Sequence, residues 1–143
     1  MILDANILLN AVNTTARHHG VAVAFMEEHL NGDVRVGLPW QSVGAFVRIA
    51  THPRIMANPM SPASAAAQVE EWFAAPATWL PAVTPHTWSL LRRLLEDHEV
   101  GGNLVPDAQL AALAIQHGVP VVSGDSDFAR FPEIAWINPL VPS

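Results

Sequence analysis

Four aspartates stand where carboxylates from separate parts of the chain can meet. Asp4 directly follows the first apolar residues of the chain, and Asp125 and Asp127 directly follow the apolar run 119–122. Asp107 lies at the start of a helical pattern that precedes this run. In a parallel sheet the carboxyl ends of the strands meet at one edge, so we expect the four carboxylates to gather there.

A shared metal ion is the interpretation we favour for these acids. Clustered carboxylates repel one another at low effective dielectric, and a hard cation removes that repulsion. Each acid also has a structural alternative, because Asp107 can stabilise a helix N-terminus and Asp125 with Asp127 can stabilise a turn. Asp4 is harder to explain in this way, because a carboxylate at a sheet edge is costly unless it is paired or bound to metal.

The types of residue present narrow the chemistry that such a site can perform. The chain has no cysteine, tyrosine or lysine, which excludes disulfides, thiolate metal sites, tyrosine nucleophiles and Schiff bases. Carboxylate ligands favour Mg²⁺ or Mn²⁺ over Zn²⁺. Such an ion neutralises a phosphate and activates a bound water, so the predicted reaction is hydrolysis of a phosphodiester bond.

Strand-like and helix-like segments alternate along the sequence. We expect short buried strands at 1–3, 34–38, 119–122 and 134–137. After a turn at Asp4 to Asn6 we expect a first helix, and then further helices at 18–30, 39–51, 61–73, 84–102 and 103–117. This alternation predicts an α/β fold, a three-layer α/β/α sandwich around a parallel sheet of about four or five strands.

Size and composition indicate one globular domain over residues 1–143. Half of the residues are apolar and 14% are charged, which excludes a disordered chain. No signal peptide or long apolar span is evident, so we expect a cytoplasmic protein that does not enter a membrane. The formal charge of −6 opposes nucleic-acid binding unless a metal ion neutralises several of the acids.

Read together, three segments resemble the PIN-domain nucleases and, more narrowly, the VapC-type toxins of bacterial toxin–antitoxin pairs. These segments are Asp4 to Asn6, Asp107 to Ala114 and Ser123 to Phe128. Segments 38–40, 45–48, 51–54 and 136–140 resemble a subgroup of these toxins, so the resemblance covers nearly the whole chain. It implies a PIN-like fold.

The resemblance also implies roles for individual residues. It places three metal ligands at Asp4, Asp107 and Asp125. It makes Asp127 a supporting catalytic carboxylate, and it makes Asn6 and Ser123 hydrogen-bonding supports of the ligands. The implied activity is that of an endoribonuclease that uses Mg²⁺, or Mn²⁺ as a substitute, cleaves tRNA or rRNA and inhibits translation. The implied partners are a VapB-type antitoxin and a second copy of the chain in a homodimer.

One departure from the family pattern keeps other functions open. Many PIN domains carry a glutamate on the helix after the second strand, where this chain has Gly44, Ala45 and Phe46. Three acids of a later helix end are candidate replacements, although a solvated helix end is the better explanation and we assign none of them a catalytic role: Glu96, Asp97 and Glu99. The alternatives are a catalytically weakened PIN fold that binds RNA or protein, and an aspartate-based phosphatase, which the absence of lysine opposes.

Aromatic residues are expected in the core and at a partner surface. We expect Trp72, Trp79 and Trp88 to pack mainly in the core. The apolar faces of the helices at 18–30 and 40–51 are the expected walls of an antitoxin groove, with Phe25 and Phe46 in those walls.

Overall fold

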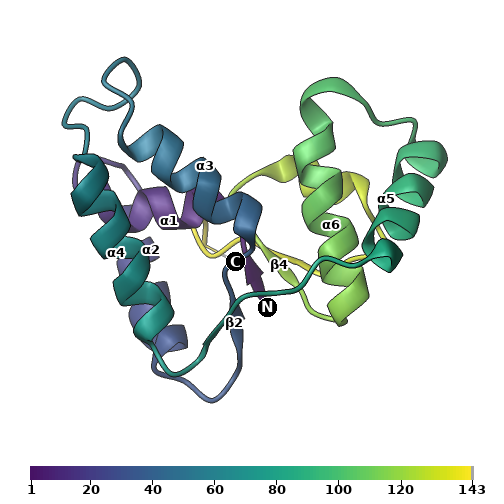
Figure 1. The fold of residues 1–143 in the computed structure, drawn as a ribbon, viewed down its shortest axis with the longest axis horizontal. Coiled ribbons are helices and arrows are strands. Elements are labelled where there is room, and N and C mark those ends of the chain that lie inside the picture. Colours follow the sequence, from purple (N-terminus) through teal and green to yellow (C-terminus); the bar gives the residue numbers. More distant parts are fainter. Residues whose placement is uncertain (143) are drawn as a thin grey trace.

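A five-stranded parallel sheet forms the centre of the protein. The computed structural model describes residues 1–142 and places the strands in the order β3-β2-β1-β4-β5 (Figure 1). Each strand has two residues: β1 Ile2–Leu3, β2 Val36–Gly37, β3 Thr78–Trp79, β4 Val121–Val122 and β5 Trp136–Ile137. The predicted α/β fold with a short parallel sheet is confirmed.

The two central strands contribute side chains to both faces of the sheet. Ile2 and Val121 pack in one hydrophobic cluster, whereas Leu3 and Val122 pack in the other. Successive side chains of a strand point to opposite faces, so a strand buried on both sides must be apolar at every position. This explains why continuous apolar runs in the sequence correctly predicted β1 and β4.

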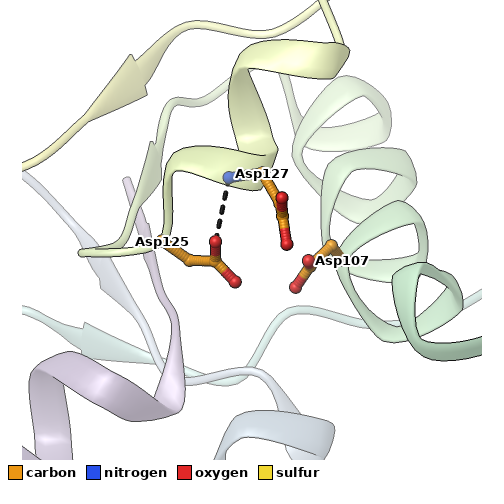
Figure 2. A group of neighbouring side chains, drawn as sticks. All are labelled: Asp107, Asp125 and Asp127. Atoms are coloured by element: carbon orange, nitrogen blue, oxygen red, sulfur yellow. Dashed lines mark hydrogen bonds between the residues drawn. The ribbon is translucent and has the colours of Figure 1, made fainter.

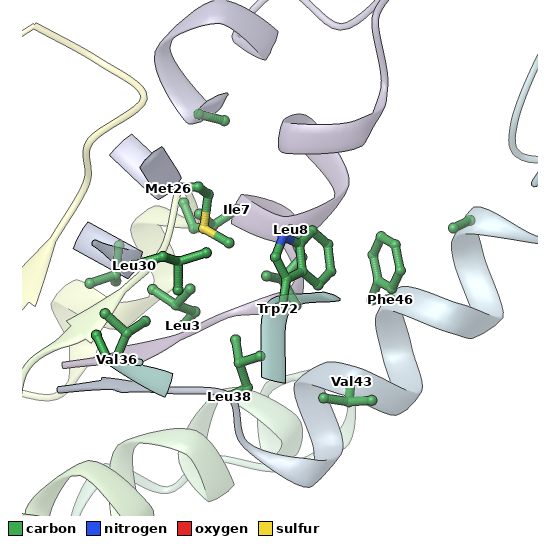
Figure 3. Packing of buried hydrophobic residues seen from close by; sticks show 14 of the residues in the cluster. Leu3, Ile7, Leu8, Met26, Leu30, Val36, Leu38, Val43, Phe46 and Trp72 are labelled. Atoms are coloured by element: carbon green, nitrogen blue, oxygen red, sulfur yellow. The ribbon is translucent and has the colours of Figure 1, made fainter. Parts of the chain in front are cut away.

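Helices cover both faces of this sheet. Four helices surround the first cluster, which is shown in Figure 3: α1 Ala5–Val12, α2 His19–Leu30, α3 Trp40–Ala50 and α4 Pro62–Ala74. Two helices and a short 3-10 helix bury the second hydrophobic cluster: α5 Pro85–His98, α6 Val105–His117 and η2 Ser126–Arg130. A further 3-10 turn, η1 Gly102–Leu104, leads into α6.

Local sequence signals account for the starts of two helices. Ser61 caps α4 by accepting a hydrogen bond from the Ser64 backbone amide, and proline occupies the first helical position. Thr84 and Thr87 form a reciprocal capping box at the start of α5. These signals fix the N-termini because they satisfy backbone N–H groups that have no partner inside the helix.

The expected end of one helix was wrong, and one strand of the five was not located from the sequence. The helix expected to run to Gly102 ends at His98, because Glu99 adopts a left-handed conformation with φ 49° and stops it. Strand β3 was not expected, since it has two residues and proline on either side. Its position depends on backbone hydrogen bonds with residues far away in the sequence. The Val36 N–H donates to the Ala77 carbonyl, and the Leu38 N–H donates to the Trp79 carbonyl.

The expected groove between the second and third helices is also absent at Phe46. Its side chain is fully buried and packs edge-on against Trp72, with ring centroids 4.9 Å apart. Phe46 therefore belongs to the core and cannot form the wall of a partner groove. Across residues 1–142, no helix combines the length and apolar character needed to span a membrane.

Candidate metal centre

Three carboxylates converge between the start of α6 and η2. Asp107 lies in the first turn of α6, whereas Asp125 caps η2 and Asp127 lies in its first turn. One carboxylate oxygen from each residue lies within 4.8 Å of those from the other two (Figure 2). Oxygens this close match the chemistry of a hard divalent cation, which takes carboxylate ligands.

Asp125 organises its own turn while facing the other acids. One of its carboxylate oxygens accepts a hydrogen bond of 2.8 Å from the Asp127 backbone amide. This bond brings the two side chains of η2 onto the same side, facing Asp107 across the gap in Figure 2. The turn therefore serves as a scaffold for two of the three carboxylates.

The pKa of Asp107 records the electrostatic strain of this arrangement. Burial of the carboxyl, followed in order by the negative charges of Asp125, Asp4 and Asp127, raises its pKa to about 6. A bound divalent cation would oppose each of these causes, because it stabilises the charged form of the carboxylate.

Asp4 lies beside these three acids but has different partners. Its side chain caps α1, with one oxygen accepting from the Ala5 backbone amide at 2.8 Å. The other oxygen accepts from the Ser123 hydroxyl at 2.7 Å and from the Asn6 amide at 3.1 Å. Burial raises the pKa of Asp4 and the charge of Asp125 raises it further, while the bonds from Ser123 and Ala5 lower it.

Asn6 and Ser123 connect Asp4 to the turn that carries Asp125. The Asn6 amide donates to the Ser123 hydroxyl at 2.9 Å and accepts from the Gly124 backbone amide, also at 2.9 Å. The Ser123 hydroxyl in turn accepts from the Asp125 backbone amide at 3.0 Å. Hydrogen bonds of this kind orient metal ligands, which is the supporting role expected of both residues.

Sequence analysis missed two contributors to the site from the C-terminal segment. The Trp136 indole N–H donates to the Ser123 carbonyl at 2.9 Å. Leu140 is buried against Gly124, where an added β-carbon would lie 2.7 Å from the Leu140 Cδ1 atom. Gly124 was the available signal, because a glycine beside a cluster of acids often marks a close approach of another part of the chain.

The position that carries glutamate in many PIN domains has no acid here. Gly44 is exposed and Phe46 is buried in the core. Glu96, a candidate replacement, forms an ion pair of 2.9 Å with Arg92 on the exposed side of α5. Among residues 1–142, the acids that could jointly hold a metal are Asp107, Asp125 and Asp127, so neither Asp97 nor Glu99 joins them.

One cation borders the acids. The Arg130 Nε atom lies 3.8 Å from a carboxylate oxygen of Asp127, and both side chains are about half exposed. A pair this long and this exposed contributes little stability. The Arg130 guanidinium can therefore leave Asp127 and bind another anion.

Comparison with protein families identifies relatives over nearly the whole chain. The model of the PIN domain matches residues 1–134. Ribonuclease VapC37 of Mycobacterium tuberculosis is 44% identical over 138 residues, which cover 96% of each chain. Ribonuclease VapC33 of the same species is 37% identical over 140 residues, which cover 98% of each chain.

Solved structures of distant sequence share the fold. One is VapBC2 from Rickettsia felis bound to a promoter DNA fragment, with TM-score 0.70, 15% identity and 96% of both chains covered. Another is FitAcB from Neisseria gonorrhoeae, with TM-score 0.68, 17% identity and the same coverage of both chains. At these identities the similarity concerns the arrangement of the sheet and helices.

Proposed function

Because the chain belongs to the PIN-domain family, we propose that it is a metal-dependent endoribonuclease of the VapC type. The observation that carries this proposal is the meeting of Asp107, Asp125 and Asp127 within 4.8 Å. Relatives named ribonucleases VapC37 and VapC33 support RNA as the substrate. The specific RNA is a tRNA or rRNA, whose cleavage inhibits translation.

The donor set fits a hard divalent cation. It consists of carboxylate oxygens from two elements. The pKa of Asp107 is raised by burial first and by the neighbouring carboxylates second, and a bound cation opposes both causes. Asp4, Asp107 and Asp125, the ligands expected from the sequence, would hold the ion, with Asp127 as a further carboxylate in the same cluster as Asp107 and Asp125. When bound, Mg²⁺ or Mn²⁺ supplies charge neutralisation of the scissile phosphate and activation of water.

The chain's own residues position these groups. Asn6 and Ser123 hold Asp4 and the Asp125 turn together through five hydrogen bonds: Asn6 to Asp4, Asn6 to Ser123, Ser123 to Asp4, Gly124 to Asn6 and Asp125 to Ser123. Arg130 borders the acids and provides a cation for a phosphate oxygen of the RNA.

A VapB-type antitoxin neutralises the enzyme, which acts in the cytoplasm as a homodimer of one-domain chains, each spanning residues 1–143. A hollow of about 280 Å³ between α1, α2 and α4, lined by both apolar and polar side chains, is the surface that suits an antitoxin segment. Val12, Val23, Met26 and Trp72 line it together with Glu27 and Glu71. This composition fits an amphipathic helix with apolar anchors and a basic residue at its edge.

A PIN fold with weakened turnover is the second candidate. The observation that favours it is the absence of any acid on α3, where many PIN domains carry a glutamate. A weakened site would still bind a divalent cation and RNA but would not cleave RNA.

Cleavage of total RNA tests the proposal. The purified protein is incubated with RNA in Mg²⁺, Mn²⁺ or EDTA, and the new ends are mapped by sequencing. Asp125→Asn is the test variant, and Asp33→Asn, at an exposed position outside the acidic site, is its charge-matched control. Discrete metal-dependent cuts with wild type and the control, absent with Asp125→Asn, support the enzyme, whereas metal binding without cuts supports the weakened fold.

A further inference from the structure

One face of α3 is exposed at three positions a helical turn apart. Trp40, Gly44 and Arg48 occupy positions i, i+4 and i+8, so their side chains lie on one face of the helix, and all three are exposed. We call this face the α3 stripe. Trp40 is 74% exposed, the largest exposed fraction among the large apolar side chains of residues 1–142.

The α3 stripe begins beside the acidic site. The Gln41 side-chain amide donates to the Pro106 carbonyl at 3.2 Å, and Pro106 immediately precedes Asp107. This bond joins the first turn of α3, which contains Trp40, to the first turn of α6. Strands β2 and β4 run parallel to β1, so α3 begins at the same sheet edge as Asp4 and Asp125.

The chemistry of the α3 stripe fits an unpaired RNA strand. An exposed indole offers a flat apolar surface to a nucleobase. Next to it, Gly44 has no side chain, and an added β-carbon would meet nothing within 4 Å, so the surface stays open. Arg48 ends the stripe about 12 Å from Trp40 along the helix axis and offers a cation to a phosphate.

Because the protein is acidic, base stacking is better suited than electrostatic attraction to binding RNA at this surface. A chain with a formal charge of −6 and no lysine has little general attraction for phosphate groups. Base stacking does not depend on charge and tolerates any base. An exposed aromatic side chain near the acids is therefore a suitable contact for RNA where a basic surface is lacking.

We propose that the α3 stripe binds single-stranded RNA, with Trp40 stacking on an unpaired base near the scissile bond and Arg48 contacting a phosphate. This inference rests on the proposed ribonuclease function, because it places the strand next to the acids that would cut it. It assigns the α3 stripe to RNA rather than to a protein partner.

Binding without metal separates this surface from catalysis. A fluorescent single-stranded RNA oligonucleotide of mixed sequence is titrated with protein in EDTA, and the same strand paired with its complement is the duplex control. Trp40→Ala should weaken single-strand binding by roughly 5- to 150-fold, whereas Trp40→Phe should retain most of the affinity. The wild type should bind the duplex more weakly, because its bases are already stacked.

The role of Arg48 has its own readout. Arg48→Gln should reduce the slope of log affinity against log salt by about 1, whereas Trp40→Ala should leave that slope unchanged. Two controls should match wild type: Val34→Ala, which shortens an exposed apolar side chain outside the stripe, and Arg92→Gln, which removes an arginine paired with Glu96.

The outcomes distinguish this inference from the proposed function. If wild type cleaves RNA but does not bind single strands in EDTA, or if Trp40→Ala binds them as tightly as wild type, the α3 stripe is not an RNA surface and the nuclease stands. If Trp40→Ala instead halves the molecular mass in solution with RNA affinity unchanged, the stripe is an interface between copies. If wild type binds RNA in EDTA but never cleaves it, and Trp40→Ala weakens this binding, the α3 stripe is an RNA surface and the proposed nuclease activity is wrong.

Discussion

Leu140 covers Gly124 so closely that a β-carbon on Gly124 would lie 2.7 Å from the Leu140 Cδ1 atom. The pair joins the C-terminal segment to the turn that carries Asp125. The match to the PIN-domain model ends at residue 134, so the contact joins a turn inside this match to a residue beyond it. The C-terminal segment thus contributes to the geometry of the metal centre.

This contact predicts that Gly124→Ala weakens metal binding. The new methyl group must displace either Leu140 or the turn, and movement of the turn separates Asp125 from Asp107. Leu140→Ala vacates the space, so the double variant Gly124→Ala/Leu140→Ala should bind Mn²⁺ more tightly than Gly124→Ala alone. Mn²⁺ titration of the four proteins measures this coupling.

Loss of a buried leucine also destabilises the protein, so a control is needed. Leu30→Ala removes a leucine from the same hydrophobic cluster at a position on α2 outside the acidic site. It should lower the melting temperature by a similar amount and leave Mn²⁺ affinity unchanged. Strictly additive effects of Gly124→Ala and Leu140→Ala on Mn²⁺ affinity would show that the contact does not position the turn.

The raised pKa of Asp107 predicts how stability depends on pH in the metal-free protein. The folded state holds the Asp107 proton up to a pKa of about 6, whereas the ordinary value is 3.8. This contribution to stability is complete below pH 3.8 and is lost as the pH rises through about 6. Asp107→Asn, which stays neutral, should therefore gain stability relative to wild type as the pH rises.

Melting temperatures measured in EDTA between about pH 3 and about pH 7 test this, because this range spans the two pKa values of Asp107. The melting temperature of Asp107→Asn should rise relative to that of wild type across this range. The melting temperature of Asp33→Asn should show no such rise. A difference that stays constant with pH would mean that Asp107 titrates alike in the folded and unfolded protein.

The hollow between α1, α2 and α4 predicts where the antitoxin binds. Val23 lines this hollow, whereas Val21 on the same helix is 47% exposed and does not line it. Val23→Glu should prevent copurification of the coexpressed antitoxin, because it places a charge where apolar anchors must bury. Val21→Glu should retain the coexpressed antitoxin as wild type does. Equal retention of the antitoxin by Val23→Glu and Val21→Glu would rule out this hollow as its binding site.

Sequence reasoning was most successful where a local pattern determines the structure. The apolar runs at Ile2–Leu3 and Val121–Val122 are buried on both faces, and the caps at Ser61 and Thr84 start helices at the expected residues. The same logic placed Asp107 in the first turn of α6 and Asp125 directly after β4.

Long-range contacts determine the features that sequence reasoning missed. Strand β3 depends on its pairing with β2, and the contact between Gly124 and Leu140 joins segments on either side of β5. Phe46 has the helical spacing of a surface groove but packs in the core against Trp72, which lies on another helix. Asp127, expected as a supporting carboxylate, has an oxygen within 4.8 Å of oxygens of Asp107 and Asp125, and its role at the site stays a prediction.

Mn²⁺ affinity of Asp107→Asn is the measurement that most directly tests whether these acids form a metal centre. Calorimetric titration at neutral pH compares wild type, Asp107→Asn and the charge-matched control Asp33→Asn. We expect wild type and Asp33→Asn to bind Mn²⁺ alike and Asp107→Asn to bind it at least roughly tenfold more weakly. Equal affinity of all three proteins would contradict this expectation.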